Sequence, residues 1–292
     1  MDKKYLLAIS GGGDSMFLLN EYKNKNIIVA HVNYNQRKTS WYDQKLVENF
    51  CKKNNIKLYV LNLKKDEFKT GNFQEWAREK RYSFFKEIYL KEKCDYLFTA
   101  HQKDDFLETA IFQKINKRFT YYYGIKKHNC IDEMNVYRPL LFKYTKKQIE
   151  KICYKNKIDY ALDYSNLLPK YSRNRIRIML NNINIIKKNW WILKFRIKNL
   201  FLNSTYKSVL REYKLWKEVK FEQNVFQLLK YKSELIHMLI YKNFPKENIN
   251  LSSKKVHSIE KFILSNRRTS KYKLKDDIYL EKEKGKIISN NI

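Results

Sequence analysis

Short apolar segments alternate with helical patterns from residue 1 to residue 116, and this alternation restricts the fold more than any other feature of the chain. Each segment is short, as buried strands are, and ends in glycine or polar residues. The predicted strands are Lys4–Ser10, Ile27–Asn33, Lys57–Leu63 and Asp95–Ala100. The predicted helices begin near Asp14, Ser40, Asn72 and Lys103. Strands and helices that alternate in this way predict an α/β fold with a doubly wound, mostly parallel sheet.

The pattern changes farther along the chain. Residues 117–135 show little periodicity and are predicted to form a loop, which precedes a last strand ending at Pro139. Beyond Arg177 long helical patterns predominate, and strand patterns return only over Lys271–Ser289. We therefore predict two domains: an α/β domain over residues 1–185, and a mainly helical extension over residues 186–292 that ends in a short β segment.

The charge balance predicts an anionic partner. The chain has 61 Lys and Arg against 30 Asp and Glu, a formal net charge of +31. Lys and Arg that neutralise phosphates release counterions and thereby add affinity, so nucleic acid is the favoured partner. A bias toward AT-rich codons is the alternative. It explains why Lys replaces Arg, but it does not explain why basic residues outnumber acidic residues.

The apolar runs and the cysteines indicate the cellular compartment. There is no apolar run of transmembrane length and no pattern typical of a signal peptide. The four cysteines are widely spaced and form no CxxC pair, which argues against a disulfide framework and against a cysteine zinc site. We therefore expect a reduced, cytoplasmic protein that does not bind a membrane. The oligomeric state stays open, with a homodimer among the alternatives.

Three of the six glycines stand together in the segment Ser10–Ser15, between the first predicted strand and the following helix. Glycines let the backbone approach a phosphate, and a helix N-terminus adds free N–H groups. Asp14 can hold a magnesium ion that bridges phosphates. The segment lacks the Gly-Lys-Ser/Thr ending of a Walker A loop and is not a dinucleotide-binding GxGxxG. An ordinary glycine turn capped by Asp14 is the alternative, but the clustering favours a phosphate site.

A second group of polar residues follows the fourth predicted strand. His101 ends this strand, and Asp104, Asp105 and Glu108 follow within about one helical turn. The carboxyl ends of parallel strands meet at one edge of the sheet, so these acids are expected to face the glycine loop. These acids would bind either a metal ion or a cationic substrate. The alternative is a solvated helix start, where acids interact favourably with the helix dipole.

At this point the sequence resembles a known family. SGGGDS after an N-terminal strand is similar to the pyrophosphate-binding loop of the N-type ATP pyrophosphatases, the PP-loop superfamily. Further segments narrow the resemblance to the tRNA(Ile)-lysidine synthases. They are HVNYNQR (His31–Arg37), EWAREKRY (Glu75–Tyr82), TAHQKDDFLET (Thr99–Thr109), RPLL (Arg138–Leu141) and DYSNLLPKYSRNRIR (Asp163–Arg177). The resemblance covers about residues 4–180.

The resemblance implies a Rossmann-like PP-loop fold and a ligase that modifies tRNA. ATP would bind at Ser10, Gly11, Gly12, Gly13, Asp14 and Ser15, with Mg²⁺ at Asp14. In a tRNA(Ile) with a CAU anticodon, O2 of the wobble cytidine would attack the α-phosphate, giving an adenylated base and diphosphate. L-lysine would then attack C2 through its ε-amine and release AMP, which leaves lysidine.

Roles for individual residues also follow from the resemblance. Asp104, Asp105 and Glu108 would bind the substrate lysine and help deprotonate it, Arg78 would face the nucleotide phosphates, and His101 would bind phosphate or orient a carboxylate. Arg173, Asn174 and Arg177 would contact tRNA, and the helical extension would hold the tRNA body. For Arg78 and Arg81 the alternative is ion pairing with Glu75 and Glu79 on the same helix. For Arg173–Arg177 it is a solvated helix face.

Two other functions remain open on the sequence. A tRNA thiolation enzyme would share the glycine loop, although such enzymes usually employ a pair of cysteines or an iron–sulfur cluster. A non-catalytic RNA-binding protein would explain the charge, but not the glycine loop together with the acids that follow His101.

Overall fold

The computed structural model describes residues 3–36, 39–117, 119–161, 172–245, 247 and 249–288. The chain divides into two compact units, Met1–Asn199 and Leu200–Ile292, and the division falls within the long helix α7 (Ile185–Glu218). None of the helices in the described ranges combines the length and the apolar character that a membrane span needs.

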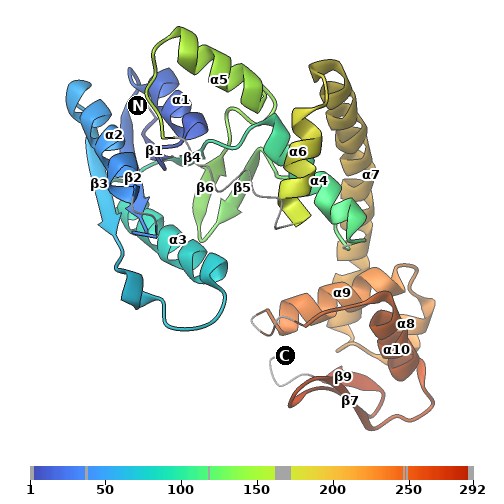
Figure 1. The fold of residues 1–292 in the computed structure, drawn as a ribbon. Helices are drawn as coiled ribbons and strands as arrows, with labels where there is room; N and C mark the ends of the chain where they lie inside the picture. The colour runs from blue at the N-terminus through green and yellow to red at the C-terminus, as the bar shows by residue number, and fades with distance from the viewer. Residues whose placement is uncertain are drawn as a thin grey trace. The chain divides into compact units, whose positions relative to one another are not determined.

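A six-stranded sheet forms the centre of the first unit (Figure 1). Its strands lie in the order β3-β2-β1-β4-β6-β5, and all neighbouring pairs are parallel except β5 with β6. The strands are β1 (Tyr5–Ala8), β2 (Ile27–Asn33), β3 (Lys57–Asn62), β4 (Tyr96–Thr99), β5 (His128–Ile131) and β6 (Met134–Tyr137). The predicted α/β class with a mostly parallel sheet is confirmed.

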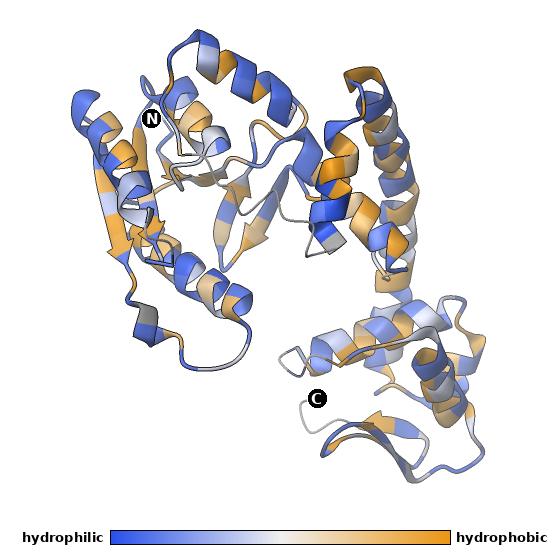
Figure 2. Cartoon of the chain, viewed as in Figure 1, coloured by the Kyte–Doolittle hydropathy of each residue, from blue (hydrophilic) through white to orange (hydrophobic). Residues whose placement is uncertain are grey.

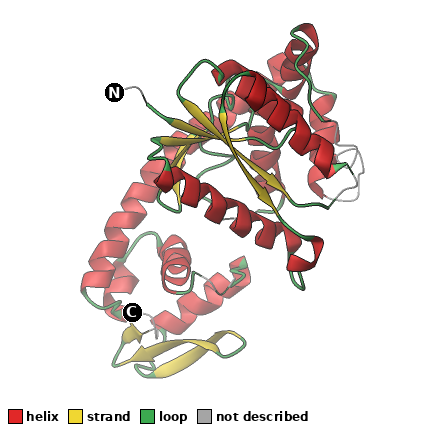
Figure 3. Ribbon diagram, turned by 90° about the vertical axis from the view of Figure 1, so that its left-hand side faces the viewer, coloured by secondary structure: helices red, strands yellow, loops and turns green. Residues whose placement is uncertain are grey.

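Helices cover both faces of this sheet (Figure 3). Because successive strand residues point to opposite faces, Leu7 packs with α1, α2 and α5, whereas its neighbour Leu6 packs with α3. Hydrophobic residues accordingly concentrate on the strands, while α5 is mostly hydrophilic (Figure 2). The helices of this unit before α7 are α1 (Gly13–Tyr22), α2 (Ser40–Lys53), the short 3₁₀ helix η1 (Lys65–Glu67), α3 (Phe73–Lys91), α4 (Lys103–Ile115), α5 (Lys146–Lys155) and α6 (Ser172–Asn181).

Strand β5 corrects the prediction that residues 117–135 form only a loop. It pairs with β6 in an antiparallel hairpin, whose turn residues Asp132 and Glu133 have φ values of 47° and 68°. Tight hairpins of this kind usually place Asn or Asp at the first of these positions and Gly at the second, and Glu133 does not match this pattern. The sequence therefore lacks the turn signal that would have indicated the hairpin.

A separate apolar cluster fixes the helix that follows β4. Phe106 and Leu107 of α4 pack with Ile176 and Leu180 of α6 and with Ile192 of α7. This packing holds the start of α4, which carries the predicted acidic residues, against the N-terminal part of α7.

The second unit is mainly helical and ends in a three-stranded meander, as predicted for Lys271–Ser289. Lys282 of the meander is 1% exposed, and its Nζ donates to the carbonyls of Phe262 (2.9 Å) and Ser265 (3.0 Å) at the end of α10. A buried ammonium thereby satisfies helix-end carbonyls. The elements after α7 are α8 (Gln223–Leu228), α9 (Lys232–Asn243), α10 (Ser253–Leu264), β7 (Ser270–Lys275), β8 (Ile278–Glu283) and β9 (Lys286–Ile288).

Candidate active site

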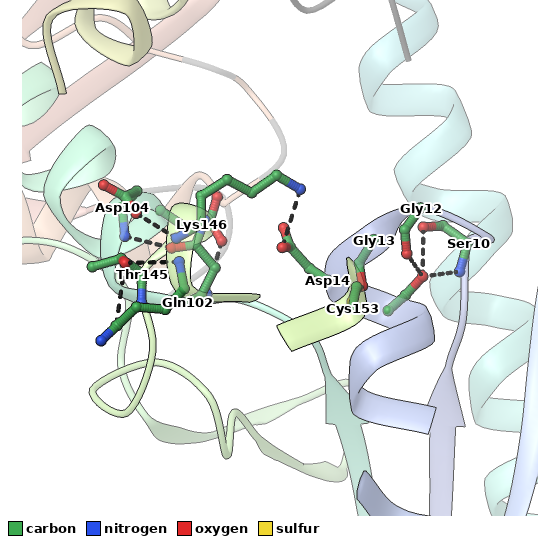
Figure 4. Close-up of polar contacts among 12 residues, drawn as sticks. Ser10, Gly12, Gly13, Asp14, Gln102, Asp104, Thr145, Lys146 and Cys153 are labelled. Atoms are coloured by element: carbon green, nitrogen blue, oxygen red, sulfur yellow. Dashed lines mark hydrogen bonds and ion pairs between the residues drawn. The ribbon is translucent and has the colours of Figure 1, made fainter. Parts of the chain in front are cut away.

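The glycine loop joins β1 to α1 and is closed by its two serines. The Ser15 Oγ donates to the Gly12 carbonyl at 2.8 Å and accepts from the Ser10 N–H at 3.2 Å (Figure 4). Gly12 is the N-cap of α1 and supplies no side chain to accept from the first helical N–H groups. The Ser15 N–H donates to the Gly12 carbonyl at 3.0 Å. The N–H groups of Gly13 and Asp14 have no such backbone acceptor among the described residues and can bind an anionic ligand, as the phosphate-site prediction requires.

Gly11 is the loop position that tolerates a side chain least. Its φ is +88°, and an added Cβ would lie 2.9 Å from the Asp43 carbonyl oxygen. We expect Gly11→Ala to weaken nucleotide binding at least about tenfold and to destabilise the fold by about 1–3 kcal/mol, because the loop must shift. Calorimetric titration with an ATP analogue and thermal unfolding test this.

Gly71→Ala is the matched control. Gly71 has a φ of +104°, but an added Cβ would meet nothing within 4 Å. This variant carries the same kind of backbone strain away from the loop, so it should lose stability and keep nucleotide affinity. Equal affinity losses in both variants would contradict the special role of Gly11.

Asp14, in the first turn of α1, forms an ion pair with Lys146 of α5 at 3.1 Å (Figure 4). Burial raises the pKa of Asp14, and Lys146 opposes this shift. Lys146 was not singled out from the sequence. The capping pattern Thr145–Gln148 predicts its helix and is confirmed, but only the fold brings that helix start to the glycine loop.

The first turn of α4 is built on a capping box. The N–H of Gln102 donates to Asp105 Oδ2 at 2.8 Å, and the Gln102 side chain accepts from the Asp104 N–H at 2.6 Å. Asp104 in turn accepts from the Lys146 N–H at 2.8 Å and pairs with the ammonium of Lys188. Lys188, on α7, is only 2% exposed. Its position in a long helical stretch gave no signal of this contact.

Glu108, one turn farther along α4, faces α6. Its carboxylate lies 2.6 Å from Arg177 Nε and 3.9 Å from Arg173 Nε, and the residue is 4% exposed. Asn174 between these arginines is buried. Two of the three residues predicted to bind tRNA thus contact one of the predicted lysine-binding acids.

Asp105 differs from the other acids at this edge. Asp14, Asp104 and Glu108 each pair with a cation of the chain, whereas in the described ranges no cation lies within ion-pair distance of Asp105. Burial, reinforced by the charges of Asp14 and Glu108, raises the pKa of Asp105 to about 7. Asp105 is therefore the carboxyl group best suited to take up a proton near neutral pH.

A dependence of stability on pH follows. Between about pH 4 and pH 7 the folded chain retains a proton on Asp105 that the unfolded chain has released, so this group lowers stability as pH rises. Asp105→Asn keeps an acceptor for the Gln102 N–H and removes the charge. We expect the difference between the thermal midpoint of this variant and that of the natural chain to become more positive from pH 5 to pH 8. Differential scanning fluorimetry measures both midpoints.

Asp104→Asn serves as the comparison because Asp104 is paired with Lys188. This variant should be less stable than the natural chain at pH 8. If the thermal midpoint of Asp105→Asn did not increase relative to the natural chain at the higher pH, the pKa of Asp105 would not be raised.

His101 lies between β4 and α4, and its Nδ1 is 2.9 Å from Thr99 Oγ1. Burial, together with the charges of Arg138, Arg81 and Arg78, lowers the pKa of His101 to about 4. The imidazole is therefore neutral at pH 7. Arg78 lies over the ring of Tyr82, 4.5 Å from its centroid. The alternative of ion pairs with Glu75 and Glu79 is not realised among the described residues.

The donor set at the glycine loop fits a magnesium ion only in part. Among the described residues there is no cluster of three or more His, Cys, Asp or Glu side chains arranged for a metal. Magnesium that bridges phosphates needs only one or two carboxylates, however, and Asp14 supplies one at the loop. The residues thus fit a nucleotide-bound ion rather than a protein-bound one.

The fold and the glycine loop together define a PP-loop protein, and a family model described as a PP-loop domain matches residues 1–183. A tRNA(Ile)-lysidine synthase from Mycoplasmopsis pulmonis is 44% identical over 279 residues, which cover 96% of this chain and 96% of that protein. One from Mesomycoplasma hyopneumoniae is 38% identical over 287 residues, covering 98% and 95%. The chain belongs to the tRNA(Ile)-lysidine synthase family.

One solved structure has a similar fold. A U34-tRNA thiolase from Methanococcus maripaludis, which contains a [4Fe-4S] cluster, matches with a TM-score of 0.56 at 19% identity, covering 69% of this chain and 73% of that chain. The likeness at this identity concerns the fold alone.

Proposed function

We propose that this chain is an ATP-dependent ligase that joins L-lysine to C2 of the wobble cytidine in a tRNA(Ile) with a CAU anticodon. Identity of 44% along nearly the whole of a lysidine synthase is the observation that carries the proposal. The site geometry supports it, because Lys146 joins Asp14 of the glycine loop to Asp104 of the acidic turn. The proposed phosphate site and the proposed ammonium site would therefore be adjacent.

In the first step the chain would position ATP for attack by the cytidine O2. The segment Ser10–Ser15 offers backbone N–H groups at the start of α1 to the phosphates, and the Ser10 and Ser15 hydroxyls would exchange their bonds within the loop for bonds to phosphate oxygens. Lys146 adds a positive charge beside the loop. Asp14 would hold Mg²⁺, which neutralises phosphate charge when bound. These groups favour the departure of diphosphate because they stabilise the charge that develops on it.

In the second step the ε-ammonium of lysine would bind at the acidic turn of α4. Asp105 is the acid of this turn with no cation partner among the described residues, and its raised pKa suits it to accept the proton that the ammonium must lose. Asp104 and Glu108, each held by a chain cation, would fix the turn and supply negative potential. Attack of the free amine on C2 then releases AMP.

The tRNA contacts and the domain division remain proposals. Arg173 and Arg177 would reach the anticodon loop from α6, and the strongly basic chain favours RNA over other partners. Residues 1–185 would form the catalytic domain and residues 186–292 the tRNA-binding extension. Of the motifs behind the resemblance, Arg37 and residues 163–171 lie outside the described residues.

The thiolation alternative fits the cysteines poorly. Cys51, Cys94 and Cys153 are buried, and burial raises the pKa of Cys51 to about 12 and those of Cys94 and Cys153 to about 11. Thiols of this kind stay protonated, whereas cluster ligation and sulfur transfer need thiolates. Cys130 alone is exposed.

Incubation of the chain with unmodified tRNA(Ile), ATP and labelled lysine tests the proposal. Incorporation of label, with one AMP released per lysine, is the expected result. Incorporation of sulfur from a donor would select thiolation instead. Binding of tRNA with neither product would mean that the chain is an RNA-binding protein without this activity.

A further inference from the structure

Three arginine side chains gather beside His101. Arg78 and Arg81 of α3 both approach the Tyr82 ring, with guanidinium carbons 4.5 Å and 5.7 Å from its centroid. Arg138 follows β6, the neighbour of the strand β4 that leads to His101. Because Tyr137 of β6 pairs with Phe98 of β4, Arg138 comes level with Thr99 at the strand end that leads to His101. The pKa of Arg138, which burial lowers most, is also affected by Tyr82 and Arg78.

These positive charges have no counter-charge from the chain. In the part of the chain that the structure describes, Arg78, Arg81 and Arg138 have no carboxylate within ion-pair distance, unlike Arg173 and Arg177. Arg138 is 4% exposed; its guanidinium donates to the Lys126 carbonyl at 2.8 Å, but its buried Nε has no acceptor among the described residues.

Such a group is unfavourable unless an anion joins it. Arg78 is exposed and Arg81 is half-buried, so water screens most of their mutual repulsion; the larger cost falls on the buried Arg138, whose Nε donor has no acceptor among the described residues. A bound oxyanion removes both costs, since guanidinium groups form charge-assisted, often bidentate hydrogen bonds to phosphate and carboxylate. His101 is neutral at pH 7 and does not repel such a ligand with an additional positive charge.

We propose that Arg78, Arg81 and Arg138 form an anion site that binds a phosphate group of a substrate. The inference rests on the proposed function, which supplies two sources of phosphate: the nucleotide, and the RNA backbone beside the reacting cytidine. Three guanidinium charges match the multiply charged phosphates of the nucleotide better than a single charge. An RNA phosphodiester and the lysine carboxylate each carry one charge, and the measurements below distinguish them. Arg81 and Arg138 thereby become binding residues together with Arg78.

Arg81→Gln and Arg138→Gln test this, with Arg81→Lys as the conservative variant. Lys91→Gln is the matched control, because it removes one positive charge from the last turn of the same helix, where Lys91 stacks on Tyr59 instead of Tyr82. Three quantities are measured for the full chain: the Kd of α,β-methylene ATP, the Kd of unmodified tRNA(Ile) at several salt concentrations, and the KM for lysine.

Either arginine variant should raise the Kd of one of the two phosphate ligands about 10- to 100-fold, and Arg81→Lys should recover part of this loss of affinity. A loss confined to the ATP analogue identifies the nucleotide as the source. A loss confined to tRNA, with a salt dependence smaller by about one unit, identifies the RNA backbone. Because Arg81 is only half-buried, its variant remains informative if Arg138→Gln fails to fold.

Two results would overturn the proposal: binding of both phosphate ligands as tight as in Lys91→Gln, or a change in the KM for lysine alone, which would indicate a carboxylate site. Failure of the proposed function is a different result. In that case the natural chain would not incorporate lysine, while the arginine variants would still weaken the binding of ATP analogue or tRNA.

Discussion

Asp14→Asn is expected to lower the rate of diphosphate release about 100- to 1000-fold. The variant keeps the size of the side chain but removes the carboxylate that would hold Mg²⁺ on the nucleotide and that pairs with Lys146. The fold should persist, because burial already disfavours a charge at Asp14, as its raised pKa shows. Diphosphate release with tRNA(Ile) and ATP, in the absence of lysine, isolates this first step.

Asp66→Asn provides the control for Asp14. Asp66 is an exposed carboxylate of η1 in the same unit, and its substitution should leave diphosphate release unchanged. Lysine transfer should fall in parallel with diphosphate release in Asp14→Asn, since the second step needs the adenylated base. Adenylation at the natural rate in this variant would show that Asp14 holds no essential metal.

Lys188→Met is expected to destabilise the first unit by about 3 kcal/mol. The ammonium of Lys188 is 2% exposed and pairs with Asp104, so its removal leaves a mostly buried carboxylate without its cation. Because Asp104 also accepts from the Lys146 N–H, the start of α5 beside the glycine loop should loosen as well. Urea unfolding monitored by circular dichroism measures the loss.

Two further variants separate the ion pair from other effects. Lys187→Met changes the adjacent, exposed lysine of the same helix and should cost less than about 0.5 kcal/mol. In the double variant Lys188→Met/Asp104→Asn no buried charge is left unpaired, so most of the lost stability should return. If the double variant were as unstable as the sum of the single variants, Lys188 and Asp104 would not act as a pair.

Much of the fold could be predicted because its signals are local. The capping residues Asn72 and Thr145 and the apolar run Ile27–Asn33 gave element positions that the structure confirms. Strand β5 was missed, since Glu133 in its turn adopts a left-handed backbone that its residue type does not indicate.

The candidate site was predictable to the same extent. The segment Ser10–Ser15 and the acids after His101 were expected at one edge, because parallel strands place their carboxyl ends there. The side chains that neutralise those acids could not be predicted from the sequence. Lys146 and Lys188 contact Asp14 and Asp104 across 132 and 84 positions of the chain, and no local pattern encodes such contacts.

The sequence by itself determined the α/β class, the glycine loop and the acidic turn, because glycine spacing, helix caps and alternating apolar segments act over a few residues. Tertiary structure alone decided which acids are paired with cations, leaving Asp105 without one among the described residues, and which arginines share the ring of Tyr82. The physical reason is that charge pairing and burial depend on distances through space, which packing of α3, α5, α6 and α7 sets.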